Sequence, residues 1–163
     1  PLILLGTCAQ ANNGEVTPGT LDERLVGWQD VMPTLLGLAG VPVPASVAGR
    51  SMLTDPCRET LYGEVGENTN ATRMLHDGRF KLIYYPVGNR VQLFDLHADP
   101  GEFTDLSATA EHADICQRLQ ALLVQELYGS DEAWLQNGSL AGLPDEGTSP
   151  RPDRGLSGQR GLH

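Results

Sequence analysis

The segment from Leu93 to Leu106 reads LFDLHADPGEFTDL and carries more structural information than any other part of the chain. Leu93 to Leu96 is an apolar run typical of a strand. Asp99-Pro100-Gly101 is a strong turn signal, because proline presets φ and glycine accepts positive φ. An acidic stretch follows and leads toward a helix. The segment therefore predicts the last strand of a sheet, a tight turn and the approach to a helix.

The residues before this segment predict three more strands. Asp77-Gly78 is typical of a two-residue type I′ hairpin turn, and Pro86-Val87-Gly88-Asn89 forms the next turn. Connections this short force neighbouring strands to be antiparallel. The predicted strands are Thr60 to Val65, Arg73 to His76, Arg79 to Tyr85 and Arg90 to Leu96.

The residues after the segment predict a helix over the sheet. Apolar residues recur every three or four positions from Ile115 to Leu127, which gives one apolar stripe. We expect a long helix from about Ala110 to Tyr128 and a shorter one from Asp131 to Asn137. The fold class is therefore α+β, with a four-stranded antiparallel sheet packed by a long C-terminal helix.

The N-terminal third has a different pattern. Asp30 to Gly40 predicts a packing helix, with Asp30 as N-cap and Gly40 as the stop signal. Leu2 to Leu5 is an apolar run, and we expect it to be a strand buried in a larger domain. We predict three parts: 1–56 as the end of an α/β domain, 57–137 as the sheet with its helices, and 138–163 as an extended Gly/Pro-rich tail.

Several segments resemble the formylglycine-dependent sulfatases of the alkaline phosphatase superfamily. LFDLHADPGEFTDL is similar to the family's C-terminal pattern L(Y/F)DLxxDPxExxNL. DVMPTLLGLAGVPVP, GRSML and DGRFKLIYY are similar to other family segments, in the family's order. The resemblance implies the C-terminal portion of a sulfatase, with the strand and helix of 1–56 belonging to a missing α/β domain. The intact enzyme would hydrolyse a sulfate ester with calcium and a formylglycine.

The family's reactive groups have no counterpart in this sequence. The nucleophile derives from Cys in a C-x-(P/A)-x-R motif, and none of Cys8, Cys57 and Cys116 has Arg at the fourth following position. The divalent cation is held by Asp-Asp and Asp-(Asn/His) pairs, and no such pair occurs here. We therefore expect no catalytic residue, no metal ligand and no bound cofactor in this chain, which alone should be inactive.

Two other interpretations stay open. Related phosphodiesterases and phosphonate monoester hydrolases have similar C-terminal parts and differ at the missing nucleophile and metal ligands. The chain could also be a stand-alone, non-catalytic module or a gene remnant.

Three polar residues are candidates for contact with the non-sulfate part of a substrate. Asn68 and Asn70 lie in the loop Gly66 to Asn70, and His76 lies near a hairpin turn. The simpler alternative is a solvated turn. Asp95, Asp99 and Glu102 are interpreted as turn residues rather than as general acids or bases.

The composition restricts the partners. The formal net charge is −10, with 21 acidic residues against 11 Lys and Arg, which argues against binding to nucleic acid. No apolar run approaches the ~18 residues of a membrane-spanning helix. The expected partners are the missing N-terminal catalytic domain and, in the intact enzyme, a small-molecule sulfate ester.

Overall fold

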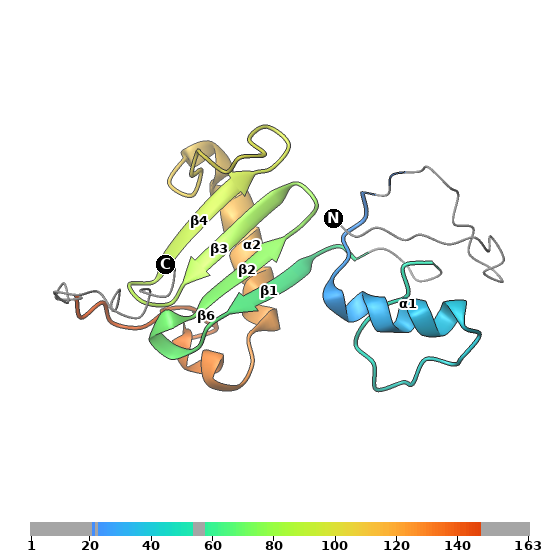
Figure 1. Cartoon of the computed structure of the whole chain (residues 1–163). Coiled ribbons are helices and arrows are strands. Elements are labelled where there is room, and N and C mark those ends of the chain that lie inside the picture. The colour runs from blue at the N-terminus through green and yellow to red at the C-terminus, as the bar shows by residue number, and fades with distance from the viewer. Residues whose placement is uncertain (1–20, 22, 54–57, 148–163) are drawn as a thin grey trace, which may run out of the picture.

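The structure is a computed structural model that describes residues 21, 23–53 and 58–147 of the 163-residue chain (Figure 1). The strand predicted at Leu2 to Leu5 lies outside the described residues, as do Cys8, Cys57 and the predicted tail beyond residue 147. No helix in the described part is long and apolar enough to cross a bilayer.

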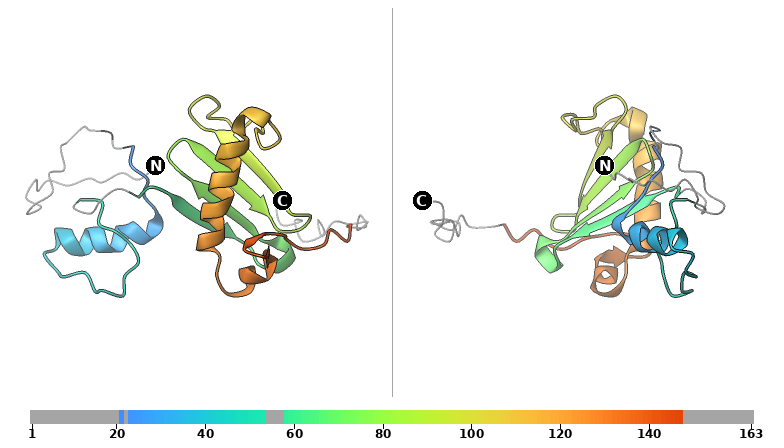
Figure 2. Two further views of the ribbon diagram at one scale, coloured as in Figure 1. Left: turned by 180° about the vertical axis from the view of Figure 1, so that it is seen from behind. Right: turned by 45° about the vertical axis from the view of Figure 1, so that its right-hand side comes forward.

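The predicted sheet is confirmed. Its four strands are antiparallel in the order β1-β2-β3-β4, and the long helix α2 (Ala113–Glu126) lies across one face (Figure 2). A short 3-10 turn, η3 (Ala110–His112), leads into α2. The fold class is therefore α+β, as predicted. The strands are β1 (Leu61–Val65), β2 (Thr72–His76), β3 (Phe80–Tyr85) and β4 (Arg90–Asp95).

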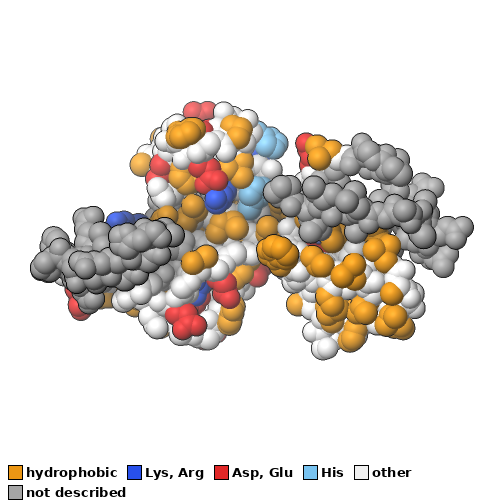
Figure 3. Space-filling view, in the orientation of Figure 1, with side chains coloured by type: hydrophobic (Ala, Val, Ile, Leu, Met, Phe, Trp, Pro, Cys, Tyr) orange, Lys and Arg blue, Asp and Glu red, His pale blue; other side chains and the backbone are white. Residues whose placement is uncertain are grey.

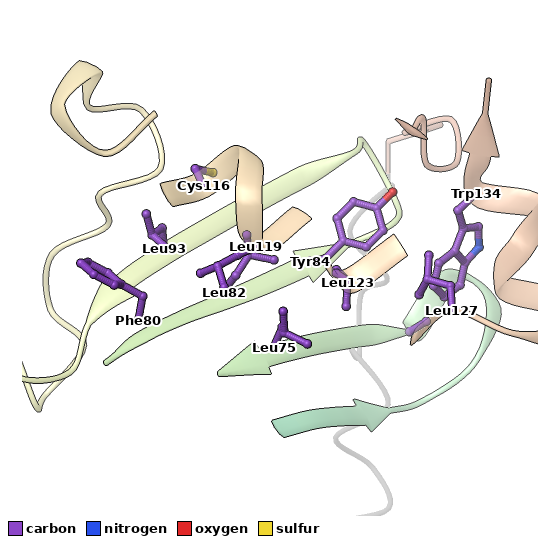
Figure 4. Packing of buried hydrophobic residues seen from close by; sticks show 11 residues of the cluster. Leu75, Phe80, Leu82, Tyr84, Leu93, Cys116, Leu119, Leu123, Leu127 and Trp134 are labelled. Atoms are coloured by element: carbon purple, nitrogen blue, oxygen red, sulfur yellow. The ribbon is translucent and has the colours of Figure 1, made fainter. Parts of the chain in front are cut away.

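The core lies between the sheet and α2. Alternate strand residues face the helix, because side chains of a strand point in turn to opposite faces. Leu75, Leu82 and Leu93 are fully buried and meet Leu119 and Leu123 of α2 (Figure 4). Burial of each of these side chains stabilises the fold by roughly 1.5–3 kcal/mol.

The β2–β3 turn differs in type from the prediction. The Asp77 amide donates to the Phe80 carbonyl at 3.1 Å, so Gly78 and Arg79 are the two central residues. Gly78 has φ 96° and stands first, which is the type II′ arrangement rather than type I′. The Asp77 carboxylate accepts from the amides of Arg79 and Phe80 and pairs with Arg118 of α2. The turn is thereby held to the helix.

The chain after α2 also differs from the prediction. The shorter helix is a 3-10 segment, η4 (Gly129–Trp134), and a hairpin of β5 (Leu135–Gln136) and β6 (Ser139–Leu140) follows. Its turn is Asn137-Gly138, where both residues have positive φ. Leu143 then exchanges hydrogen bonds with the β3–β4 turn, at 2.7 Å and 2.9 Å. The first residues of the predicted tail are therefore part of the packed fold.

The predicted N-terminal helix is α1 (Val31–Leu38), preceded by the 3-10 turn η1 (Trp28–Asp30). Asp30 occupies the N-cap position but makes no side-chain capping bond to α1. Its carboxylate instead accepts from the amides of Gly27 and Arg50, both at 2.8 Å, and pairs with Arg58. Asp30 therefore joins the α1 region to the segment that enters β1.

Candidate functional site

The structure places Asn68 and Asn70 in the β1–β2 connection, where they form the 3-10 turn η2 (Asn68–Asn70). Asn68 has φ 53°, a conformation that asparagine tolerates better than most residues. The amide of Asn70 donates to the carbonyl of Glu67 at 3.0 Å. Both asparagines are exposed, so their amide groups are available to another molecule.

His76 lies at the other end of β2. It is half-buried, and its Nδ1 accepts a hydrogen bond from the Gly78 amide at 2.7 Å. Burial lowers the pKa of His76, so the ring is neutral at pH 7. Four residue steps of about 3.3 Å separate the ends of β2 by roughly 13 Å. The structure therefore brings Asn68 and Asn70 together and keeps His76 apart from them.

A cavity of about 350 Å³ lies below the β1–β2 connection, between the end of the sheet and the start of η4. Its base is the ion pair of Arg73 and Asp131, in which Nε and Nη2 of Arg73 lie 2.6 Å and 3.0 Å from the two carboxylate oxygens. The lining residues are Glu64, Gly66, Glu67, Arg73, Tyr128, Gly129, Ser130 and Asp131.

The base of the cavity is held by hydrogen bonds within the chain. Nη1 of Arg73 donates to the carbonyl oxygens of Val65, Gly66 and Thr72. The guanidinium also lies over the Trp134 ring, 5.0 Å from its centroid. Arg73 is 4% exposed and Asp131 3% exposed. The pair is therefore a buried structural element of the chain.

The rim of the cavity is acidic. The Tyr128 hydroxyl donates to Oε1 of Glu64 at 2.9 Å, and this bond to a carboxylate raises the pKa of Tyr128. The lining carries the carboxylates of Glu64, Glu67 and Asp131 against the single guanidinium of Arg73, so its net charge is negative. The cavity can accept a cation or the hydroxyl groups of a neutral ligand, and it repels a sulfate.

The acidic residues of the turn after β4 are held in internal contacts. The guanidinium of Arg79 lowers the pKa of Asp95 to about 2. Asp99 accepts from the amide of Thr104 at 2.8 Å, as predicted for a turn residue. Glu102 pairs with Lys81 at 2.8 Å. These contacts support the interpretation as turn residues over that of general acids or bases.

The described residues do not fit a metal ion. Across 21, 23–53 and 58–147, no three His, Cys, Asp or Glu side chains meet in a way that could hold one. Cys116, the cysteine within these ranges, is a buried free thiol in the core. We therefore assign no described residue to a calcium ion.

Comparison with known proteins shows the family. Residues 11–128 match the model of the family N-sulphoglucosamine sulphohydrolase, C-terminal. An arylsulfatase of Clostridium perfringens is 28% identical over 133 residues, which cover 77% of this chain and 28% of the relative. Arylsulfatase K of Bos taurus is 33% identical over 125 residues, covering 66% and 22%.

Solved structures agree with this result. A 2-O GAG sulfatase superposes with a TM-score of 0.55 at 30% identity, covering 60% of this chain and 23% of its own. A phosphonate monoester hydrolase of Silicibacter pomeroyi shares the fold alone, at 22% identity and a TM-score of 0.50. The chain spans about a quarter of the length of these curated relatives, 28% and 22%. The resemblance to a sulfatase C-terminal portion is thus confirmed, and the chain belongs to the N-sulphoglucosamine sulphohydrolase C-terminal family.

Proposed function

We propose that this chain is the C-terminal part of an enzyme that hydrolyses sulfate esters, and that residues outside it supply the formylglycine nucleophile and the calcium ligands. The observation that carries the proposal is the family match over residues 11–128, which spans both the α1 region and the sheet. The cysteine contexts support it, because none of the three fits the C-x-(P/A)-x-R motif.

The surface of α1 supports a second part of the proposal, that this region packs on the catalytic part of the enzyme. Trp28 of η1 and Met32 and Leu35 of α1 are 89%, 46% and 54% exposed, and their spacing of four and three residues is that of one side of a helix. Figure 3 shows hydrophobic side chains gathered over this region. Apolar patches of this kind mark interaction sites. The proposed partner is the α/β domain that carries the reactive groups.

We further propose a sulfated sugar as substrate. The matching family is that of an N-sulphoglucosamine sulphohydrolase, and the superposed solved relative is a 2-O GAG sulfatase. Amide side chains suit sugar hydroxyls, because they both donate and accept hydrogen bonds. Asn68 and Asn70 would contact the non-sulfate part of the sugar, since the acidic cavity beside them repels sulfate. Because His76 lies at the other end of β2, it would contact a different part of the substrate.

The test is an assay of the intact enzyme and of this chain alone. Sulfate release is measured from 4-nitrophenyl sulfate and from a 2-O-sulfated unsaturated disaccharide. We expect activity from the intact enzyme and none from the 163-residue chain. An intact product that cleaves a phosphonate monoester and neither sulfate ester would overturn the proposal.

Two variants test the sugar contact within the intact enzyme. The double variant Asn68→Ala/Asn70→Ala should raise KM for the disaccharide and leave kcat/KM for 4-nitrophenyl sulfate unchanged. Gln125→Ala, on an exposed position of α2, is the matched control. Equal losses on both substrates would reject the assignment of Asn68 and Asn70.

A further inference from the structure

The two edges of the four-stranded sheet differ in how they are closed. The outer edge of β4 is covered by its own chain at Leu93. The Leu93 amide donates to Oδ1 of Asp105 at 3.0 Å, and the Leu93 carbonyl accepts from the Leu106 amide at 2.8 Å. This edge therefore has no backbone groups of Leu93 left for another strand.

No described residue pairs with the outer edge of β1. The Asp77 amide donates to the Phe80 carbonyl, and hydrogen-bonded pairs recur at every second residue of an antiparallel ladder. The backbone groups of Leu75 and Arg73 therefore bond to β3, and those of Thr72, Met74 and His76 bond to β1. Their partners in β1 are Val65, Gly63 and Leu61. The backbone groups of Tyr62 and Glu64 consequently point outward, and among the described residues β1 pairs only with β2.

The open edge borders the acidic cavity. The side chains of Tyr62 and Glu64 point to the α2 face, and Glu64 lines the cavity together with Glu67. A strand paired with β1 would place alternate side chains on the same face. The cavity favours a positive charge there, because its lining carries three carboxylates, those of Glu64, Glu67 and Asp131, against the one guanidinium of Arg73.

We propose that an extended segment carrying a Lys or Arg adds to the β1 edge as a fifth strand and inserts this basic side chain into the cavity. Main-chain bonds give such strand addition its affinity, and a pocket for an alternate side chain gives its specificity. A second copy of this chain does not fit, because β1–β1 pairing would bring two acidic rims together.

The segment belongs to the catalytic part of the same enzyme, so the inference rests on the proposed function. Val65, 73% exposed at the end of β1, and η2 lie next to the proposed strand. Strand addition would therefore hold the Asn68 and Asn70 loop at the boundary between the two parts of the enzyme.

Amide hydrogen exchange tests strand addition. The amides of Tyr62 and Glu64 are measured in this chain alone and in the intact enzyme. We expect both to exchange at least about tenfold more slowly in the intact enzyme, because they become hydrogen-bonded. Gly63 and Val65 bond to β2 and serve as internal references that are protected in both. Equal rates for Tyr62 and Glu64 in the two proteins would overturn the inference.

Charge reversal tests the basic side chain. In the intact enzyme, Glu67→Lys should speed exchange at Tyr62 and Glu64 by several-fold, whereas Glu111→Lys, an exposed site in η3, should not. Equal effects of the two variants would overturn the claim of a basic partner. If the intact enzyme is an active sulfatase and its Tyr62 and Glu64 amides are not protected from exchange, strand addition alone is wrong. An inactive intact protein would count against the proposed function.

Discussion

Replacement of Asp131 by alanine should destabilise the fold by about 3 kcal/mol, the lower end of the 3–5 kcal/mol expected when one partner of a buried ion pair is removed. Asp131 is the acceptor for Nε and Nη2 of Arg73, while the three carbonyl oxygens accept only from Nη1. Oε2 of Glu64 lies 3.9 Å from Nε and can compensate in part. Because a chain of 163 residues loses about 2–4 °C of Tm per kcal/mol, Tm should fall by roughly 6–12 °C.

The assay is urea unfolding of the 163-residue chain, followed by tryptophan fluorescence. Trp134 is 2% exposed and packs on Arg73, so its emission reports on this site. Arg73→Met/Asp131→Leu should recover most of the loss, because no charge is then left buried. Lys81→Met breaks a half-exposed pair and should cost less than about 1 kcal/mol. A similar loss for Asp131→Ala and Lys81→Met would refute the reasoning.

Three further predictions use the same chain. Leu119→Ala empties a fully buried site and should lower the free energy of unfolding by about 2–5 kcal/mol in urea; a loss below about 1 kcal/mol would argue against the described core. The pKa of Asp95 is about 2 when folded, below its ordinary 3.8, so its stabilisation is present above pH 4 and disappears as the pH falls toward 2. Arg79→Met should flatten that dependence, and an unchanged slope would reject Arg79 as its cause. Leu35 is 54% exposed, so the isolated chain should tolerate Leu35→Glu. The same variant should abolish co-purification with the catalytic part, whereas Leu35→Ala should only weaken it. Equal recovery of both variants would exclude α1 from the interface.

The four-stranded sheet could be predicted because its signals are local. Period-two alternation and turn residues lie within each hairpin, and the predicted strand bounds differ from the observed ones by about one residue. The turn type was wrong at Gly78, since the closing pair Asp77–Phe80 shifts the two central positions by one residue. Asn137-Gly138 carried the same kind of signal, but the Gly/Pro-rich composition of that region led to the prediction of a tail.

The ion pairs could not be predicted because their partners are distant in sequence. Asp30 is of a residue type typical of an N-cap, but its carboxylate pairs with Arg58, which lies 28 positions away. Arg73 and Asp131 are 58 positions apart, and nothing in either local sequence selects the other. The cavity depends on this second pair. Of its lining, only the loop at Gly66 and Glu67 was noted from the sequence, as a polar connection between strands.

We propose that this chain belongs to a longer sulfatase whose other residues carry out the reaction. The most direct test is to sequence the reading frame upstream of the codon for Pro1. We expect a continuous frame with a C-x-(P/A)-x-R motif and paired aspartate codons. A start codon at or just before Pro1, or an upstream frame without that motif, would contradict it.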